Sequence, residues 1–287
     1  AGGTLGVMIP PSILFVVYGI MTETPIGALF IAGILPGILG TLLYMSAVSY
    51  MTLRNPRLGP GGPKATGAER LRGLREVWQV IVLFSLVLGG MYVGWFSPTE
   101  AAGVGAFGAI ILTALSGRLT MKVLRTGFAE TASTTAMIFM ILIGATIFNY
   151  FLDAAGATQG LIDFVKTYNF SKYEVLLVLC VFYIILGCLM DSLSMILLTV
   201  GAVFPLVKAV GFDPIWFGVI LVTLGEIGMI TPPVGMNLFV LNATVPNLPL
   251  QTISRGIFPF VIADVARIFL LVLFPAIAIW LPSFMGK

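Results

Sequence analysis

An apolar run from residue 215 to residue 245 is long enough to cross a bilayer, but residues in its middle interrupt a helix. Residues 225 to 237, GEIGMITPPVGMN, bring three glycines, two adjacent prolines and an acidic side chain to this depth. Proline removes a backbone donor and blocks helix continuation, and glycine frees the backbone. Non-helical backbone is tolerated there only where it is buried in protein or lines a cavity. The stretch therefore predicts a broken transmembrane helix that forms half of an ion and substrate site.

The composition indicates that the rest of the chain also lies in a membrane. Of its 287 residues 59% are hydrophobic and 9% are charged, with a mean hydropathy of +1.08. Soluble chains carry roughly 25% charged residues. Several runs of about 20 apolar residues predict an all-α polytopic membrane protein.

Histidine is absent, which excludes imidazole acid–base chemistry, histidine metal ligands and histidine proton relays. Cys180 and Cys188 lie in one apolar stretch and are expected to be buried, inert thiols. The net charge of +3 says little about a partner, because the basic residues cluster in loops, and no nucleic-acid partner is expected.

A second interrupted segment precedes the first. Residues 175–208 are too long for one crossing and are broken by the polar sequence DSLS at 191–194. Two half-length helices joined at this tip would make a re-entrant hairpin that enters and leaves the membrane on one side. Further upstream, the loop at residues 53–76 is rich in arginine and lysine, which predicts that it lies in the cytoplasm.

The opening residues repeat the 225–237 element. A shift of 222 places Gly3, Gly6, Pro10 and Pro11 on Gly225, Gly228, Pro232 and Pro233. Residues 33–36 resemble residues 256–259 at a shift of 223. Paired hydrophobic segments interrupted by glycine and proline point to a transporter site at the interface of two repeats. The same shift places the counterpart of the 175–208 hairpin before residue 1.

An oxygen-only set in the second repeat suits Na⁺, a hard cation, because unwound carbonyls and helix C-termini offer oxygens to a cation. The candidates are Asp191, Ser192, Ser194, Gly225, Gly228, Thr231, Gly235 and Asn237. The matching, partial set in the first repeat is Gly3, Gly6 and Ser12.

Each candidate also has a structural interpretation. Asp191 could cap the hairpin, Ser12 could be an N-cap, and Thr231 and Asn237 could bond neighbouring helices. Glu226, an acid inside a span, is either a charged site residue or one half of a structural pair with a Ser or Lys.

Asp264 and Arg267 stand at i and i+3 in the last span and are expected to form a structural pair.

Four segments in this order resemble the large membrane subunit of tripartite ATP-independent periplasmic (TRAP) transporters. They are residues 4–12 (TLGVMIPPS), 97–102 (SPTEAA), 187–191 (GCLMD) and 228–237 (GMITPPVGMN). The chain looks like the C-terminal two-thirds of such a subunit.

The resemblance implies inverted repeats, a transport domain that moves as an elevator against a scaffold, and a multi-pass location in a bacterial or archaeal inner membrane. It implies Na⁺-coupled import of small organic acids such as C4-dicarboxylates or sialic acid, without enzyme activity. A periplasmic binding protein and a small four-helix membrane subunit are the implied partners, beside the bilayer. The hairpin tip with residues 228–237 would form one Na⁺ site, and residues 3–12 half of another.

These expectations divide the chain into five parts. They are the end of a first transport element with a broken helix (1–25), a scaffold helix with the basic cytoplasmic loop (26–76), scaffold and connecting helices (77–152), a second transport element (153–246, with the hairpin at 175–208 and the broken helix at 215–245), and a C-terminal scaffold helix (247–287). The alternatives are a related Na⁺/carboxylate carrier that needs no binding protein and, less favoured, a channel or an intramembrane enzyme.

Overall fold

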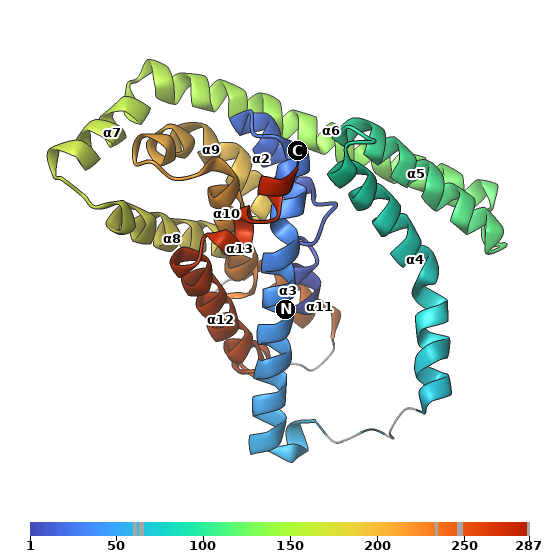
Figure 1. The fold of residues 1–287 in the computed structure, drawn as a ribbon. Coiled ribbons are helices and arrows are strands. Elements are labelled where there is room, and N and C mark those ends of the chain that lie inside the picture. The colour runs from blue at the N-terminus through green and yellow to red at the C-terminus, as the bar shows by residue number, and fades with distance from the viewer. Residues whose placement is uncertain (60–61, 63–65, 233–234, 246–248, 286–287) are drawn as a thin grey trace. The chain divides into compact units, whose positions relative to one another are not determined.

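A computed structural model describes residues 1–59, 62, 66–232, 235–245 and 249–285. The described residues form helices and connecting turns, without a strand (Figure 1). Six of the helices are long and apolar enough to cross a membrane. The expected all-α polytopic fold is therefore confirmed.

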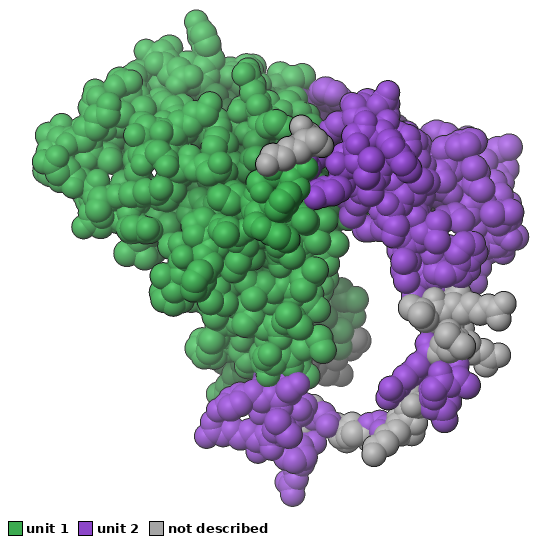
Figure 2. Space-filling view, viewed as in Figure 1, with its two compact units in different colours: residues 1–48, 141–284 green, residues 49–140, 285–287 purple. Residues whose placement is uncertain are grey.

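The chain forms two compact units (Figure 2). Unit 1 comprises residues 1–48 and 141–284, and unit 2 comprises residues 49–140 and 285–287. Two long helices, α3 (Ile26–Arg54) and α6 (Met121–Ala154), continue from one unit into the other. The remaining helices of unit 1 are α1 (Gly2–Leu5), α2 (Ile13–Thr22), α7 (Ala157–Thr167), α8 (Lys172–Leu189), α9 (Ser192–Ala209), α10 (Pro214–Ile230), α11 (Met236–Thr244), α12 (Leu250–Leu273), α13 (Ala276–Ile279) and the 3₁₀ turn η2 (Pro282–Phe284). Unit 2 contains the 3₁₀ turn η1 (Pro56–Leu58), α4 (Gly67–Val93) and α5 (Pro98–Leu115).

Helices α4, α5 and α8 each begin at a capping box, in which a hydroxyl and a glutamate bond each other's backbone N–H. In α4 the N–H and the hydroxyl of Thr66 both donate to Glu69, and Glu69 N–H donates back to Thr66 Oγ1. These donors stabilise the carboxylate and lower the pKa of Glu69 below its ordinary value. Three local sequence signals thus determine where these helices start.

Helix α10 is the centre of unit 1. Its side chains from Trp216 to Gly228 are all buried, as expected for a helix that is apolar on every face. It packs along α8 and also against α9, α12 and α2. The Trp216 indole N–H donates to Leu271 O at 2.9 Å, and the Tyr18 hydroxyl donates to Pro214 O at 2.7 Å. These bonds attach the N-terminal end of α10 to α12 and α2.

Both repeats contain the predicted break in a helix. Backbone from Gly6 to Ser12 separates α1 from α2, and backbone between Ile230 and Met236 separates α10 from α11. The hairpin arms α8 and α9 meet at residues 190–191. The two arms have 18 residues each and divide the stretch into halves, as expected, and by length and composition each arm also counts as a candidate span. Whether the hairpin is re-entrant stays a prediction.

Candidate functional site

Asp191 forms the tip of the hairpin. α8 ends at Leu189, Met190 is extended, and α9 begins directly after Asp191. Asp191 Oδ2 accepts the N–H of Ser194 at 3.0 Å, and Asp191 Oδ1 accepts the Ser194 hydroxyl at 2.6 Å. Both carboxylate oxygens therefore cap the first turn of α9. This agrees with the structural interpretation given above, in which Asp191 caps the hairpin.

The break after α10 depends on a glycine in an unusual conformation. Thr231 is extended, and Gly235 has φ +48° immediately before α11. A Cβ atom at Gly235 would lie 2.9 Å from the carbonyl oxygen of Thr231, so a larger residue is disfavoured by both strain and space. The Thr231 hydroxyl donates to Ile227 O at 2.6 Å, which leaves its oxygen lone pairs for another partner.

The hairpin tip and the helix break lie against each other. Gly187 on α8 and Gly228 on α10 touch backbone to backbone, because a Cβ added to Gly228 would lie 2.4 Å from Gly187 Cα. The Cys188 thiol donates to Thr231 O at 3.5 Å. A Cβ added to Gly225 would lie 2.8 Å from the Ser192 hydroxyl oxygen. Gly225 and Gly228 thus act through their lack of a side chain, which lets the two segments meet.

Two helix C-termini meet at this junction. The last turns of α8 and α10 contact each other through Gly187, Gly228 and Cys188. Each helix end carries partial negative charge and carbonyl groups without a helical donor. Ser192 is 3% exposed, and its hydroxyl oxygen has no hydrogen-bond partner among the described residues. A buried polar atom without a protein partner is uncommon.

The candidates of the first repeat lie in the equivalent break, between α1 and α2, but its glycines are less buried than those of the second repeat. Ser12 is the N-cap of α2, is 3% exposed, and makes no capping bond, so its hydroxyl is also buried without a partner among the described residues. Gly3 and Gly6 are exposed, whereas their repeat equivalents Gly225 and Gly228 are buried under the hairpin.

The structure does not bring every candidate into the junction. Asn237 lies in the first turn of α11 with an exposed side chain. Pro10, Pro11 and Pro232 lie within the two breaks, and Pro233 lies outside the described residues. The assignment of the ion-binding residues stays a prediction.

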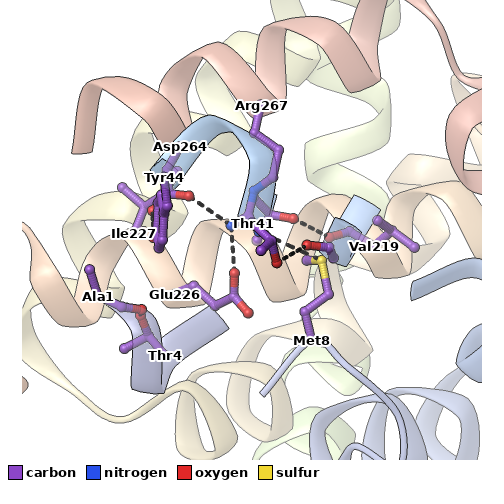
Figure 3. Close-up of polar contacts among 12 residues, drawn as sticks. Ala1, Thr4, Met8, Thr41, Tyr44, Val219, Glu226, Ile227, Asp264 and Arg267 are labelled. Carbon is purple, nitrogen blue, oxygen red and sulfur yellow. Dashed lines mark hydrogen bonds and ion pairs between the residues drawn. The ribbon is translucent and has the colours of Figure 1, made fainter. Parts of the chain in front are cut away.

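A buried ionic cluster lies one turn from the break (Figure 3). Arg267 Nη2 contacts Glu226 Oε2 at 2.5 Å and Asp264 Oδ1 at 3.0 Å, and all three side chains are fully buried. The Tyr44 hydroxyl donates to Asp264 Oδ2 at 2.6 Å. Gly40 makes room for the guanidinium, since a Cβ there would lie 2.6 Å from Arg267 Nη1. The cluster joins α10, α12 and α3.

Sequence reasoning identified the Asp264–Arg267 pair but left the partner of Glu226 open. Glu226 pairs with an arginine rather than the expected Ser or Lys, and the part played by Tyr44 was not anticipated. One available signal was the repeat: the shift of 223 places Tyr44 on Arg267, which marks α3 and α12 as equivalent helices. Equivalent positions near the axis of an internal repeat are expected to lie close together.

Apolar helices interrupted by extended backbone, with helix ends that converge on a buried hydroxyl, define a multi-pass membrane protein of the transporter class. The family model for the DctM component of tripartite ATP-independent periplasmic transporters matches residues 1–277. The chain belongs to this family, as the sequence resemblance predicted. It is accordingly a multi-pass protein of the inner membrane.

Large permease proteins of several bacteria are similar in sequence to this chain. A C4-dicarboxylate TRAP transporter large permease protein of Pseudomonas aeruginosa is 35% identical over 285 residues, which cover 99% of this chain and 66% of the relative. A sialic acid TRAP transporter large permease protein of Vibrio cholerae is 34% identical, over 98% of this chain and 66% of the relative. An ectoine/5-hydroxyectoine permease of Ruegeria pomeroyi is 32% identical, over 96% of this chain and 64% of the relative. The chain thus spans about two thirds of their length, and their names describe transport rather than catalysis.

Proposed function

We propose that the chain forms part of the large membrane subunit of a Na⁺-coupled secondary transporter that imports a small organic acid. The observation that carries the proposal is the meeting of the α8 and α10 C-termini around the buried, unpartnered hydroxyl of Ser192. Helix C-termini and hydroxyl oxygens suit a hard cation, and Asp191 adds one negative charge at the tip. The donor set therefore fits Na⁺.

In this proposal the substrate binds at the same junction, but to a helix N-terminus, which carries partial positive charge, instead of to helix C-termini. α9 and α11 begin where α8 and α10 end. Asp191 already caps the start of α9, whereas α11 has no side-chain cap, so the first N–H groups and positive dipole end of α11 are available to a carboxylate. Relatives are named for C4-dicarboxylates, sialic acid and ectoine. We infer a C4-dicarboxylate or sialic-acid-like substrate for this chain, with ectoine as the comparison compound.

We propose an elevator movement in which α3 and α12 travel with the broken helices. The division made from sequence assigned both helices to the scaffold. If α10 moved alone, the buried contact between Glu226 and Arg267 would break and leave charges without a partner. Removing one partner of a buried ion pair costs about 3–5 kcal/mol. The cluster thus supports a moving body that includes residues 26–48 and α12.

The partners proposed for the complete transporter are a periplasmic binding protein that delivers the substrate and a small four-helix membrane subunit. The family match supports this assembly over a carrier that works alone. Uptake measured in proteoliposomes of the complete complex, with and without the binding protein, separates the two. Transport at full rate without the binding protein would support the independent carrier instead. Conduction without a Na⁺ gradient would support a channel.

The ion site is tested by the Na⁺ dependence of uptake in the same proteoliposomes. Ser192→Ala removes the unpartnered oxygen, and Asp191→Asn removes the charge while keeping a capping oxygen. We expect each change to raise the Na⁺ concentration for half-maximal uptake by about tenfold, the effect of roughly 1.4 kcal/mol. Thr223→Ala is the control, because its buried hydroxyl donates to Val219 O on the same helix, away from the break. Unchanged Na⁺ dependence in both site variants would refute the assignment.

A further inference from the structure

A cavity lies at the opposite end of α8 and α10 from the helix break. It has a volume of about 180 Å³ and is lined by residues at the start of α8, in the turn before α10, in the first turn of α10 and around the end of α12. The 18 residues of α8 separate it from the hairpin tip by roughly 27 Å at 1.5 Å per residue. The cavity is therefore independent of the proposed ion site.

Two aromatic rings make a rigid wall of this cavity. Phe212 and Trp216 stack with ring centroids 5.2 Å apart and an interplanar angle of 19°. Both residues are buried, and the Trp216 indole N–H donates to Leu271 O at 2.9 Å. Because packing and a hydrogen bond hold the rings, the wall does not depend on a ligand for its shape.

Two opposite charges line the same cavity without neutralising each other. Lys172 Nζ lies 4.5 Å from the centroid of the Phe212 ring and donates to Gly211 O at 3.1 Å. Asp213 Oδ1 accepts the N–H of Trp216 at 2.9 Å. Both side chains are exposed, and no ion pair joins them within the described part of the chain. The ammonium retains further donors and the carboxylate further acceptors for a ligand.

The position of the cavity associates it with the membrane surface. α8, α9 and α12 are long enough to span a bilayer, and the start of α8 and the end of α12 both meet here. Tyrosine, tryptophan and lysine are typical of the boundary between hydrocarbon and water. From Tyr173 at the cavity, an exposed apolar ridge runs down α8 at intervals of four residues. Its members are Tyr173, Leu177, Val181 and Ile185, with exposed fractions of 65%, 66%, 51% and 55%.

We propose that this cavity binds the headgroup of a phospholipid that carries both a phosphate and a primary ammonium group. The phosphate lies at the Lys172 ammonium, and the lipid ammonium lies at the Asp213 carboxylate. The ridge on α8 takes an acyl chain. An anionic headgroup without an amine satisfies Lys172 but brings like charge to Asp213. A soluble zwitterion satisfies both charges but makes no use of the ridge.

Native mass spectrometry of the purified protein with added lipids tests the proposal. Phosphatidylethanolamine supplies both groups, and phosphatidylglycerol supplies the phosphate alone. The variants are Lys172→Gln, which keeps a donor for Gly211 O, and Asp213→Asn, which keeps the capping oxygen for α10. Lys208→Gln is the matched control, because Lys208 Nζ also lies over a ring, Phe204 at 4.7 Å, but does not line the cavity.

We expect phosphatidylethanolamine to bind about tenfold more tightly than phosphatidylglycerol, and Asp213→Asn to lose most of this preference, as for one charge-assisted hydrogen bond. Lys172→Gln should weaken the binding of both lipids about tenfold, because both carry the phosphate. Lys208→Gln should behave as the unmodified protein. Displacement of the lipid by millimolar glycerophosphoethanolamine would support recognition of the headgroup. Equal binding of the two lipids, a preference insensitive to Asp213→Asn, or affinities insensitive to Lys172→Gln would each overturn the proposal. So would binding of the soluble compound without binding of the lipid.

Discussion

Arg267 on α12 and Glu226 on α10 form a 2.5 Å ion pair in which neither side chain is exposed. The pair links the helix that carries the second break to a helix 41 residues further along the chain. Asp264 lies on the other side of the guanidinium and is held in turn by the Tyr44 hydroxyl from α3. Residues from α3, α10 and α12 in unit 1 thus share one buried ionic cluster. Their relative position depends on the integrity of this cluster.

Arg267→Met should destabilise the protein strongly, because it leaves two carboxylates buried without their cation. The expected loss is about 3–5 kcal/mol, measured as a lower unfolding temperature and denaturant midpoint in detergent. Arg255→Met is the control, since Arg255 is on the same helix but exposed. The triple variant Arg267→Met, Glu226→Gln, Asp264→Asn should recover part of the loss, because it buries no uncompensated charge. Equal stability of Arg267→Met and Arg255→Met would contradict this role.

The features that could be predicted from the sequence were mainly helix breaks and turns, because local residue patterns specify them. Glycine and proline positions located both breaks, and the polar residues at 191–194 located the hairpin tip. The start of α4 at Gly67 was assigned to the cytoplasmic loop, although the Thr66–Glu69 capping box marks it. The last span was expected to continue through the C-terminal part, but α12 ends at Leu273, before Pro275. Proline cannot continue the helical hydrogen-bond ladder.

The ionic cluster was harder to predict, because its contacts join distant residues. Tyr44 and Asp264 are 220 residues apart, and nothing in the sequence around either residue indicates that the two are in contact. Close contacts between backbones were equally hidden: Gly187 and Gly228 have no side chain, and only the fold shows that they touch. Such contacts depend on helix packing rather than on a local pattern.

Gly228→Ala should separate the hairpin from α10, whereas Gly6→Ala at the equivalent position should be tolerated in this chain. The added Cβ at Gly228 meets the Gly187 backbone at 2.4 Å, while at Gly6 its nearest neighbour is Gly3 O at 3.3 Å. Overpacking of this kind typically costs about 1–3 kcal/mol. Thermal unfolding of the two variants measures the difference. Similar losses in both would show that the close contact on α10 does not support the hairpin.

Asn149 on α6 fills the space left by Gly201 on α9. A Cβ at Gly201 would lie 2.4 Å from Asn149 Cγ, and neither amide atom has a hydrogen-bond partner among the described residues. Asn149→Leu should therefore be neutral or stabilising, because an unsatisfied buried amide costs about 1–3 kcal/mol. Gly201→Ala should destabilise, and adding Asn149→Ala should restore part of the loss. The matched control Gly144→Ala, with open space at its Cβ, should not destabilise. Lack of coupling in this double-mutant cycle would exclude the contact.

Cys188 and Cys180 allow occupation of the proposed ion site to be followed chemically. Both are free thiols on α8; Cys188 donates to Thr231 O at the break, and Cys180 lies two turns away. If Na⁺ binds at the junction, it should hold the hairpin tip against α10 and slow the reaction of Cys188 with a small methanethiosulfonate. The reaction of Cys180 should not change, so each variant with one cysteine replaced by serine reports one position. The rates are measured in NaCl and in choline chloride at equal ionic strength. We expect Na⁺ to slow modification of Cys188 several-fold, and an equal effect on both thiols would indicate a general change in the protein instead.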